Sequence, residues 1–148
     1  MTRLFGALAL SATVLATALL VPTAMADEAE AESCLRTKIW DGYEAGWAVR
    51  TATSATLAQG EYRIYLVTLY AGNEYQLLAC ADAAAKNVDL VLHDADGNVV
   101  MQDEASDRQP ALTYKPSTTD TYFVAVHATE LAEGKGEKSG VGMAVTYR

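Results

Sequence analysis

The sequence predicts an all-β protein, an antiparallel β-sandwich of about eight strands. Three observations lead to this prediction. Short segments rich in β-branched and aromatic residues follow one another along most of the chain. Within many of them polar and apolar residues alternate, as they do in half-buried strands. Turn-forming residues separate these segments at intervals typical of antiparallel sandwiches.

The N-terminal end of the chain predicts export. Arg3 gives a positively charged start, and an apolar run covers residues 4–21. Small residues at Ala24 and Ala26 fit cleavage by a signal peptidase after Ala26, so residues 1–26 form the expected signal peptide. The alternative is an uncleaved membrane anchor, because the run approaches the length of a span. Its Ala, Ser, Thr and Gly content makes it weakly apolar for that role, so we expect a periplasmic or secreted protein.

Cleavage would leave residues 27–148, enough for one domain with a modest core. The whole chain has 11 basic and 19 acidic residues, and loss of Arg3 leaves 10 and 19, a net charge of −9. So acidic a chain repels nucleic acid and anionic membranes and attracts cations or basic partners. Residues 27–33 are acidic and small, which predicts a flexible leader. The single domain is then expected over residues 34–148.

The mature chain contains two cysteines, Cys34 and Cys80. In an exported protein an even number of cysteines predicts a disulfide, and two allow only one intramolecular pairing. Two free thiols or a metal-binding pair are the alternatives. Neither a Cys-x-x-Cys spacing nor a neighbouring histidine supports a metal site. We therefore expect a bridge that joins the N-terminal segment to the strand around Cys80.

The first five expected strands are distinguished by their composition. Residues 46–57 are small and β-branched, and residues 61–70 are aromatic and β-branched, apolar on both faces, so that their inward face stays undecided. Residues 74–81 follow an Ala-Gly-Asn turn signal. Residues 88–93 and 98–103 flank an Asp-Gly pair, which is typical of a tight hairpin turn.

Three further strands are expected over residues 111–115, 121–128 and 141–148. Alternation indicates which side chains share a face: Leu90 with Leu92, and Val124 with Tyr122 and Val126. Helical signals are weak, and residues 79–87 and 127–138 predict at most one helical turn each.

A series of short motifs from Leu57 to Arg148 follows a consistent order. An aromatic strand leads into an Ala-Gly-x-x-Tyr turn, then Asp-Leu-x-Leu, an Asp-Gly hairpin, an acidic loop and a Thr-Tyr strand. In order and spacing these motifs resemble the bacterial pre-peptidase C-terminal domain. The resemblance implies a jelly-roll-like sandwich that is usually appended to secreted hydrolases and is not itself a catalyst. The matching residues are Ala71, Gly72, Tyr75, Asp89, Leu90, Leu92, Asp96, Gly97, Thr121, Tyr122 and Val126.

The segment around Gly97 places the acceptor oxygens of Asp94, Asp96 and Asn98 close together. An EF-hand calcium loop would need glycine at its sixth position and glutamate at its twelfth. Here glycine is fourth and the twelfth residue is Ala105. A hairpin turn explains the segment better, because Asp-Gly supplies the positive φ of such a turn.

Calcium is nevertheless the metal that the resemblance implies, because collagen-binding relatives hold it with acidic loops. The corresponding residues are Asp103, Glu104 and Asp107, together with Asp89. Their hard oxygen atoms suit calcium. The alternative, which we favour, is a solvated acidic surface that keeps the protein soluble.

Three aromatic residues, Trp40, Tyr43 and Trp47, lie within eight positions and have glycines around them. Exposed, they would form a stacking platform for a sugar or a protein partner. Buried, they would belong to the core, which is the more frequent location of such residues. His93 and His127 are expected on strand surfaces and are weak candidates for a catalytic base.

These observations together favour an exported, non-enzymatic binding module for a polymer, an envelope component or a protein partner. No nucleophile elbow and no zinc-protease motif is present in the sequence. Two alternatives stay open. One is a structural accessory subunit or stability module of a separately encoded hydrolase, and the other is a small hydrolase that uses His93 or His127.

Overall fold

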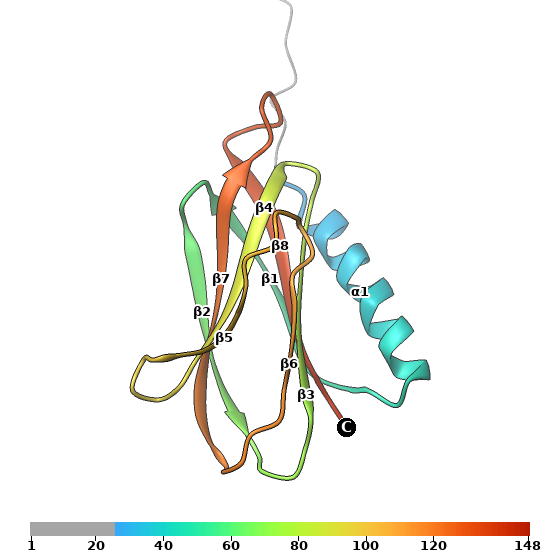
Figure 1. The fold of residues 1–148 in the computed structure, drawn as a ribbon. Coiled ribbons are helices and arrows are strands. Elements are labelled where there is room, and N and C mark those ends of the chain that lie inside the picture. Colours follow the sequence, from blue (N-terminus) through green and yellow to red (C-terminus); the bar gives the residue numbers. More distant parts are fainter. Residues whose placement is uncertain (1–25) are drawn as a thin grey trace, which may run out of the picture.

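The computed structural model describes residues 26–148, which form one helix followed by eight strands (Figure 1). The signal peptide expected over residues 1–26 therefore lies, apart from Ala26, outside the described residues. The elements are α1 (Glu28–Glu44), β1 (Ala48–Ala58), β2 (Tyr62–Leu69), β3 (Tyr75–Ala81), β4 (Ala85–His93), β5 (Val99–Asp103), β6 (Ala111–Tyr114), β7 (Asp120–Leu131) and β8 (Lys138–Tyr147).

The strands form two four-stranded sheets that pack face to face. One has the order β1-β8-β3-β6, and the other has the order β2-β7-β4-β5. Every pairing is antiparallel. The predicted all-β antiparallel sandwich of about eight strands is confirmed, and each expected strand overlaps an observed one.

The main core lies between the two sheets. Leu90 and Leu92 of β4 face Tyr75 and Leu77 of β3, and all four side chains have no exposed surface. Burial of each such side chain contributes about 1.5–3 kcal/mol, so this layer is the main source of stability. The predicted inward faces of β4 and β7 are confirmed. In β2, whose inward face the sequence left undecided, the last part of the strand turns Val67 and Leu69 inward.

The two expected helical turns are absent. Most of residues 79–87 belong to β3 and β4, and the first part of residues 127–138 belongs to β7. Ala79, Ala81 and Ala85 of the first segment are buried and paired with neighbouring strands. Pairing and burial therefore override the helical propensity of alanine.

Helix α1 begins inside the segment that was expected to be a flexible leader, so that prediction is wrong. The Asp27 carboxylate accepts a hydrogen bond from the Glu30 N–H at 3.0 Å and caps the helix. Glu28 and Glu30 lie in the first turn, where negative charge complements the helix dipole. The acidic composition that predicted disorder therefore helps to start a helix, and the domain begins there and not at Cys34.

Helix α1 packs on the outer face of the β1-β8-β3-β6 sheet (Figure 1). A second, small cluster joins them, formed by Leu35, Leu78, Cys80 and Ala144. At the first turn the Thr56 hydroxyl of β1 donates to the Glu28 carboxylate at 2.6 Å. Among residues 26–148, no helix is both long and apolar enough to cross a membrane.

The predicted disulfide is present between Cys34 of α1 and Cys80 of β3. It closes a loop whose ends are 46 residues apart in the sequence. The small apolar contact under the helix is thus reinforced by a covalent link. Disulfides are typical of proteins that fold in oxidising compartments outside the cytoplasm.

Replacing Cys34 and Cys80 together by alanine should lower the free energy of unfolding by about 2–4 kcal/mol, because the unfolded chain regains the freedom that the loop removes. Urea unfolding of the oxidised protein and of the double variant measures the difference. The reduced wild type serves as the control and should resemble the variant. Equal stability of all three would contradict a structural role for the bridge.

Candidate functional site

The sandwich has two outer faces, and only one of them is covered. Helix α1 lies on the β1-β8-β3-β6 sheet, whereas the outer face of the β2-β7-β4-β5 sheet carries no further element among the described residues (Figure 1). Large apolar side chains point outward from β2 on this open face. Tyr62 is 61% exposed, Ile64 52% and Leu66 67%.

Cross-strand pairing extends this apolar surface across the sheet. Ile64 and Leu66 lie opposite Ala125 and Phe123 of β7. On the other side of β7, Val91 of β4 lies opposite Ala125. Residues directly opposite each other in an antiparallel pair share a face, so these side chains are contiguous. We call this surface, formed by Tyr62, Ile64, Leu66, Val91, Phe123 and Ala125, the outer patch.

A shallow pocket indents the outer patch near the hairpin between β4 and β5. Its volume is ≈ 290 Å³, and it is lined by Ile64, His93, Gly97 and Phe123. The lining is almost entirely apolar. Such a hollow suits an apolar side chain of a partner better than a polar small molecule.

The patch reaches the edge of its sheet, because β2 pairs with β7 alone. The Ala128 N–H donates to the Glu61 carbonyl at 3.0 Å, which fixes the alternation of hydrogen bonds along the pair. The backbone groups of Tyr62, Ile64 and Leu66 consequently point away from β7. Tyr62, Ile64 and Leu66 therefore present both their unpaired backbone groups at the sheet edge and their side chains on the outer face.

Acidic residues stand at the ends of the strands that carry the patch. Glu61 precedes β2, Asp94 follows β4, and Asp120 begins β7. Asp94 belongs to the predicted hairpin turn, where its carboxylate accepts hydrogen bonds from the N–H groups of Asp96 at 3.0 Å and Asn98 at 2.8 Å. Hydrogen bonds from Asn98 lower the pKa of Asp94, so the Asp94 carboxylate stays negatively charged at neutral pH.

The "DADGN" segment forms the hairpin that the sequence predicts. Gly97 has a φ of 85°, which glycine adopts without strain, and its N–H donates to the Asp94 carbonyl at 3.0 Å. The Asp94 carboxylate is occupied by backbone donors of the turn. The turn interpretation, and not a calcium loop, therefore describes this segment.

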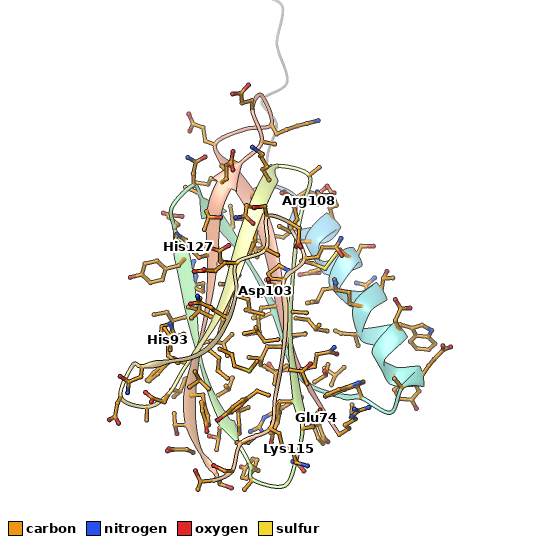
Figure 2. The ribbon with its side chains drawn as sticks, viewed as in Figure 1. Glu74, His93, Asp103, Arg108, Lys115 and His127 are labelled. Carbon is orange, nitrogen blue, oxygen red and sulfur yellow. A yellow bond between two sulfur atoms is a disulfide. The ribbon has the colours of Figure 1, made fainter. Side chains whose placement is uncertain are left out.

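The two histidines lie on the open sheet, on the side of the molecule away from α1 (Figure 2). His93 Nδ1 is 3.2 Å from the Gly97 carbonyl oxygen, and His127 Nε2 is 3.2 Å from the Gly60 carbonyl oxygen. Each ring is thus held by a nearby turn. Both histidines border the outer patch, because His93 lines its pocket and His127 lies opposite Tyr62.

The three aromatic candidates separate into an exposed pair and a buried residue. Trp40 and Tyr43, on α1, are each 67% exposed, and their rings stack with centroids 6.0 Å apart and an interplanar angle of 21°. Trp47 does not join them, so its assignment to the platform is wrong. It is buried against Gly42, and the Arg148 guanidinium lies over its ring at 4.5 Å.

Two of the four acidic calcium candidates, Asp103 and Asp107, accept hydrogen bonds from the backbone. The Asp103 carboxylate accepts from the N–H groups of Ala105 and Ala111 at 3.0 and 2.9 Å. The Asp107 carboxylate accepts a hydrogen bond from the Gln109 N–H at 2.6 Å. The Asp89 carboxylate accepts one from the side-chain amide of Asn87 at 3.3 Å, and Glu104 is exposed. Within residues 26–148, no group of three or more histidine, cysteine or acidic side chains is placed to hold a metal ion. Calcium binding stays a prediction from the resemblance.

Sequence reasoning missed the outer patch. The signal was the even-numbered apolar series Tyr62, Ile64 and Leu66, in a strand whose odd-numbered residues are apolar from Tyr65 onward. A strand that is apolar on both faces is buried on both or exposes one. Strand β2 lies at the edge of a sheet with no covering helix, so it exposes one of its two apolar faces.

No family model matches the chain, and no curated protein matches it. Among solved structures, the chain is similar to the pre-peptidase C-terminal domain of a collagenase from Bacillus anthracis, the family that its sequence motifs resemble. That likeness has 14% identity and a TM-score of 0.47 and covers 66% of this chain and 89% of that one. The chain is also similar to a periplasmic inhibitor of g-type lysozyme from Aeromonas hydrophila, with 11% identity and a TM-score of 0.45. That likeness covers 68% of this chain and 88% of that one. A de novo designed double-stranded β-helix has 11% identity to the chain and a TM-score of 0.35. The match covers 67% of this chain and 100% of that one.

Changes within the outer patch should leave the fold intact. Replacing Ile64 and Leu66 together by serine should change the free energy of unfolding by no more than about 1 kcal/mol, because both side chains are already exposed to water. Leu90→Ala, in the core, should lose about 2–5 kcal/mol. Urea unfolding measures both. A loss in the serine variant as large as that of Leu90→Ala would make the patch a structural element.

Proposed function

We propose that this domain is an exported, non-enzymatic binding module and that a protein partner docks on the outer patch. The observation that carries the proposal is the contiguous exposed apolar surface around Ile64 and Leu66 on an otherwise uncovered sheet. Single exposed apolar residues are ordinary on protein surfaces, but contiguous patches mark interaction sites. The compartment is the periplasm or the exterior of the cell, in keeping with the disulfide.

The shape and chemistry of the patch favour a protein over a carbohydrate. Aliphatic side chains dominate it, and aliphatic side chains match the anchor residues of a protein interface. The open edge of β2 supports the same conclusion, because an exposed apolar edge strand without a covering partner invites aggregation. A partner that covers Tyr62, Ile64 and Leu66 would remove that risk.

Charge indicates which proteins fit. The mature chain has a net charge of −9 from 10 basic and 19 acidic residues, and Glu61, Asp94 and Asp120 stand at the ends of the strands that carry the patch. A second copy of the same chain would bring like charges together. A basic partner is attracted instead, and its affinity falls as salt rises because exposed charges are screened.

Site-specific photo-crosslinking tests this proposal. A photoreactive residue at position 66, in the protein exported with its own leader, should give one discrete adduct in the cells that naturally export it. The same residue at Val49, which is 47% exposed on β1, is the matched control and should give none. Ile64→Lys should abolish the adduct, and mass spectrometry should identify a basic protein.

Other outcomes of this experiment would count against the proposal. An adduct with the mass of two copies of this chain would indicate self-association. Adducts of equal strength from positions 66 and 49, or from neither position, would exclude the patch as the docking surface. A separately encoded hydrolase in the adduct from position 66 would instead agree with the proposal and identify the partner as an enzyme of which this domain is an accessory subunit.

Carbohydrate binding by α1 is a second candidate function, favoured by the exposed stacked rings of Trp40 and Tyr43. Parallel aromatic faces suit the apolar faces of sugar rings. Replacing both residues by alanine should reduce co-sedimentation with insoluble cell-wall polysaccharide about fivefold or more. Ile64→Ser, on the opposite side of the molecule, is the control and should sediment like the wild type. Unchanged sedimentation of the double variant would exclude this function.

A further inference from the structure

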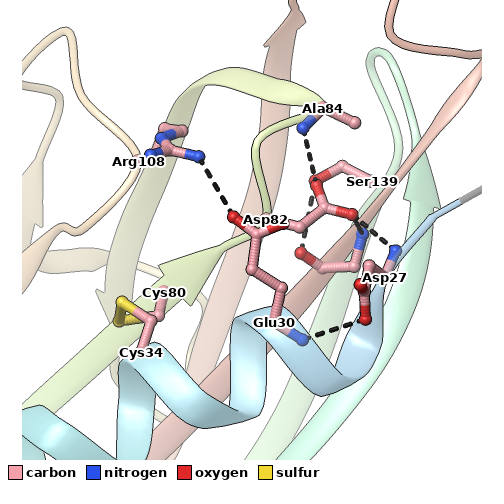
Figure 3. Close-up of polar contacts among 9 residues, drawn as sticks. Asp27, Glu30, Cys34, Cys80, Asp82, Ala84, Arg108 and Ser139 are labelled. Carbon is pink, nitrogen blue, oxygen red and sulfur yellow. Dashed lines mark hydrogen bonds and ion pairs between the residues drawn. A yellow bond between two sulfur atoms is a disulfide. The ribbon is translucent and has the colours of Figure 1, made fainter. Parts of the chain in front are cut away.

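A buried carboxylate lies where the chain enters the domain (Figure 3). Asp82, directly after β3, is 1% exposed. Its Oδ2 accepts from the Asp27 N–H at 2.6 Å and from the Gly140 N–H at 3.0 Å. Its Oδ1 accepts from the Ser139 hydroxyl at 2.7 Å and from the Ala84 N–H at 3.0 Å. All four donors are neutral.

No positive charge balances Asp82 within the described chain. Among residues 26–148, the ion pairs are those of Lys86, Arg108 and Arg148, and none involves Asp82. Burial tends to raise the pKa of Asp82, but the hydrogen bonds from Asp27, Gly140, Ser139 and Ala84 together hold it below its usual value. The group is therefore ionised, and a buried ionised carboxylate without a counter-ion is unusual.

The backbone at Asp27 also packs closely against Gly140 of β8. A Cβ atom added to Gly140 would lie 2.5 Å from the Asp27 carbonyl carbon and 2.6 Å from the Glu28 nitrogen. Only glycine allows this approach of β8 to the chain. Gly140 and Asp82 thus hold the main chain of residue 27 from two sides and fix its nitrogen against the carboxylate.

Residue 27 is also the residue that would follow the expected cut after Ala26. We propose that Asp82 is the binding site for the α-ammonium group of Asp27, which cleavage of the Ala26–Asp27 bond creates. Processing would then supply the missing counter-ion and fasten α1 to the sandwich. The site would distinguish a chain with its new N-terminus at residue 27 from a chain with any residue in front of it.

The chemistry of this step is a hydrolysis that a signal peptidase catalyses. Water adds across the Ala26–Asp27 peptide bond, Ala26 keeps a new carboxylate, and Asp27 keeps an amine that takes up a proton. The neutral N–H that now donates to Asp82 Oδ2 becomes a charged donor at the same position. Because the Asp82 carboxylate is already ionised, the gain is the direct attraction between two opposite charges in contact.

Nearby charged groups modulate this pair. Asp27 and Glu28 carry acidic side chains on the same segment, engaged with the Glu30 N–H and the Thr56 hydroxyl. Glu30 lies 3.9 Å from the Arg108 guanidinium. The acidic groups favour the protonated amine, and Asp82 is the one whose oxygen directly contacts the nitrogen of residue 27.

The pair gives stability a definite pH dependence. A free α-amino group has a pKa of about 7.7–8.0, and a contacting carboxylate raises it in the folded state. Its contribution is therefore complete below about pH 8 and is lost as pH rises through the higher folded value. At the acid end, the lowered pKa of Asp82 means that its contribution is lost as pH falls through that value.

The test compares two proteins exported with the complete leader. One is the wild type, and the other has one alanine inserted between Ala26 and Asp27, so that cleavage leaves a neutral amide at residue 27. Intact mass identifies each N-terminus. We expect the wild type to begin at Asp27 and, at pH 7, to have a Tm higher than the insertion variant by about 5 °C. The difference should disappear near pH 10.

Asp82→Asn supplies a second comparison, because it removes the charge and keeps the side-chain shape. In that background the inserted alanine should no longer change Tm. If Asp82→Asn does not fold, the pH series on the first two proteins decides alone. A wild-type N-terminus at another residue, equal Tm values at pH 7, or a difference that persists unchanged at pH 10 would each overturn the proposal.

Discussion

Burial of apolar side chains between the two sheets is the interaction on which the rest of the domain depends. Because strands alternate, filling that layer sends every second residue of each strand to an outer face. The sandwich therefore has two outer faces, and residues 26–148 contain one helix to cover them. The Cys34–Cys80 bridge fixes that helix on one sheet. The opposite face stays open, which makes its apolar residues available to a partner.

Much of the fold could be predicted because strand signals are local. Alternation in β4 and β7 identified the inward residues, such as Leu90 and Val124, and Asp-Gly identified the hairpin at Gly97. The disulfide followed from counting cysteines in an exported chain. Each of these inferences needs only neighbouring residues or a single possible pairing, so none required knowledge of which strands lie side by side.

Helix α1 and the outer patch could not be predicted because both depend on tertiary placement. The helix buries few side chains, Ala31 and Leu35 among them, so its apolar pattern is faint, and its acidic start resembles a disordered segment. Which face of β2 points outward depends on its place at a sheet edge. Trp40 and Tyr43 are exposed, the less favoured of the two alternatives that the sequence left open, whereas Trp47 is covered by Arg148, more than 100 residues away in the sequence.

The order of the strands also determines when the domain can fold. β7 is central in one sheet and β8 in the other, and both lie in the last part of the chain, between Asp120 and Tyr147. Until these strands are synthesised, β1 and β2 lack their only strand partners, and β3 and β4 each lack one of two. Most contacts join residues distant in the sequence, a topology that slows folding. The two sheets can therefore be completed only when the end of the chain is available.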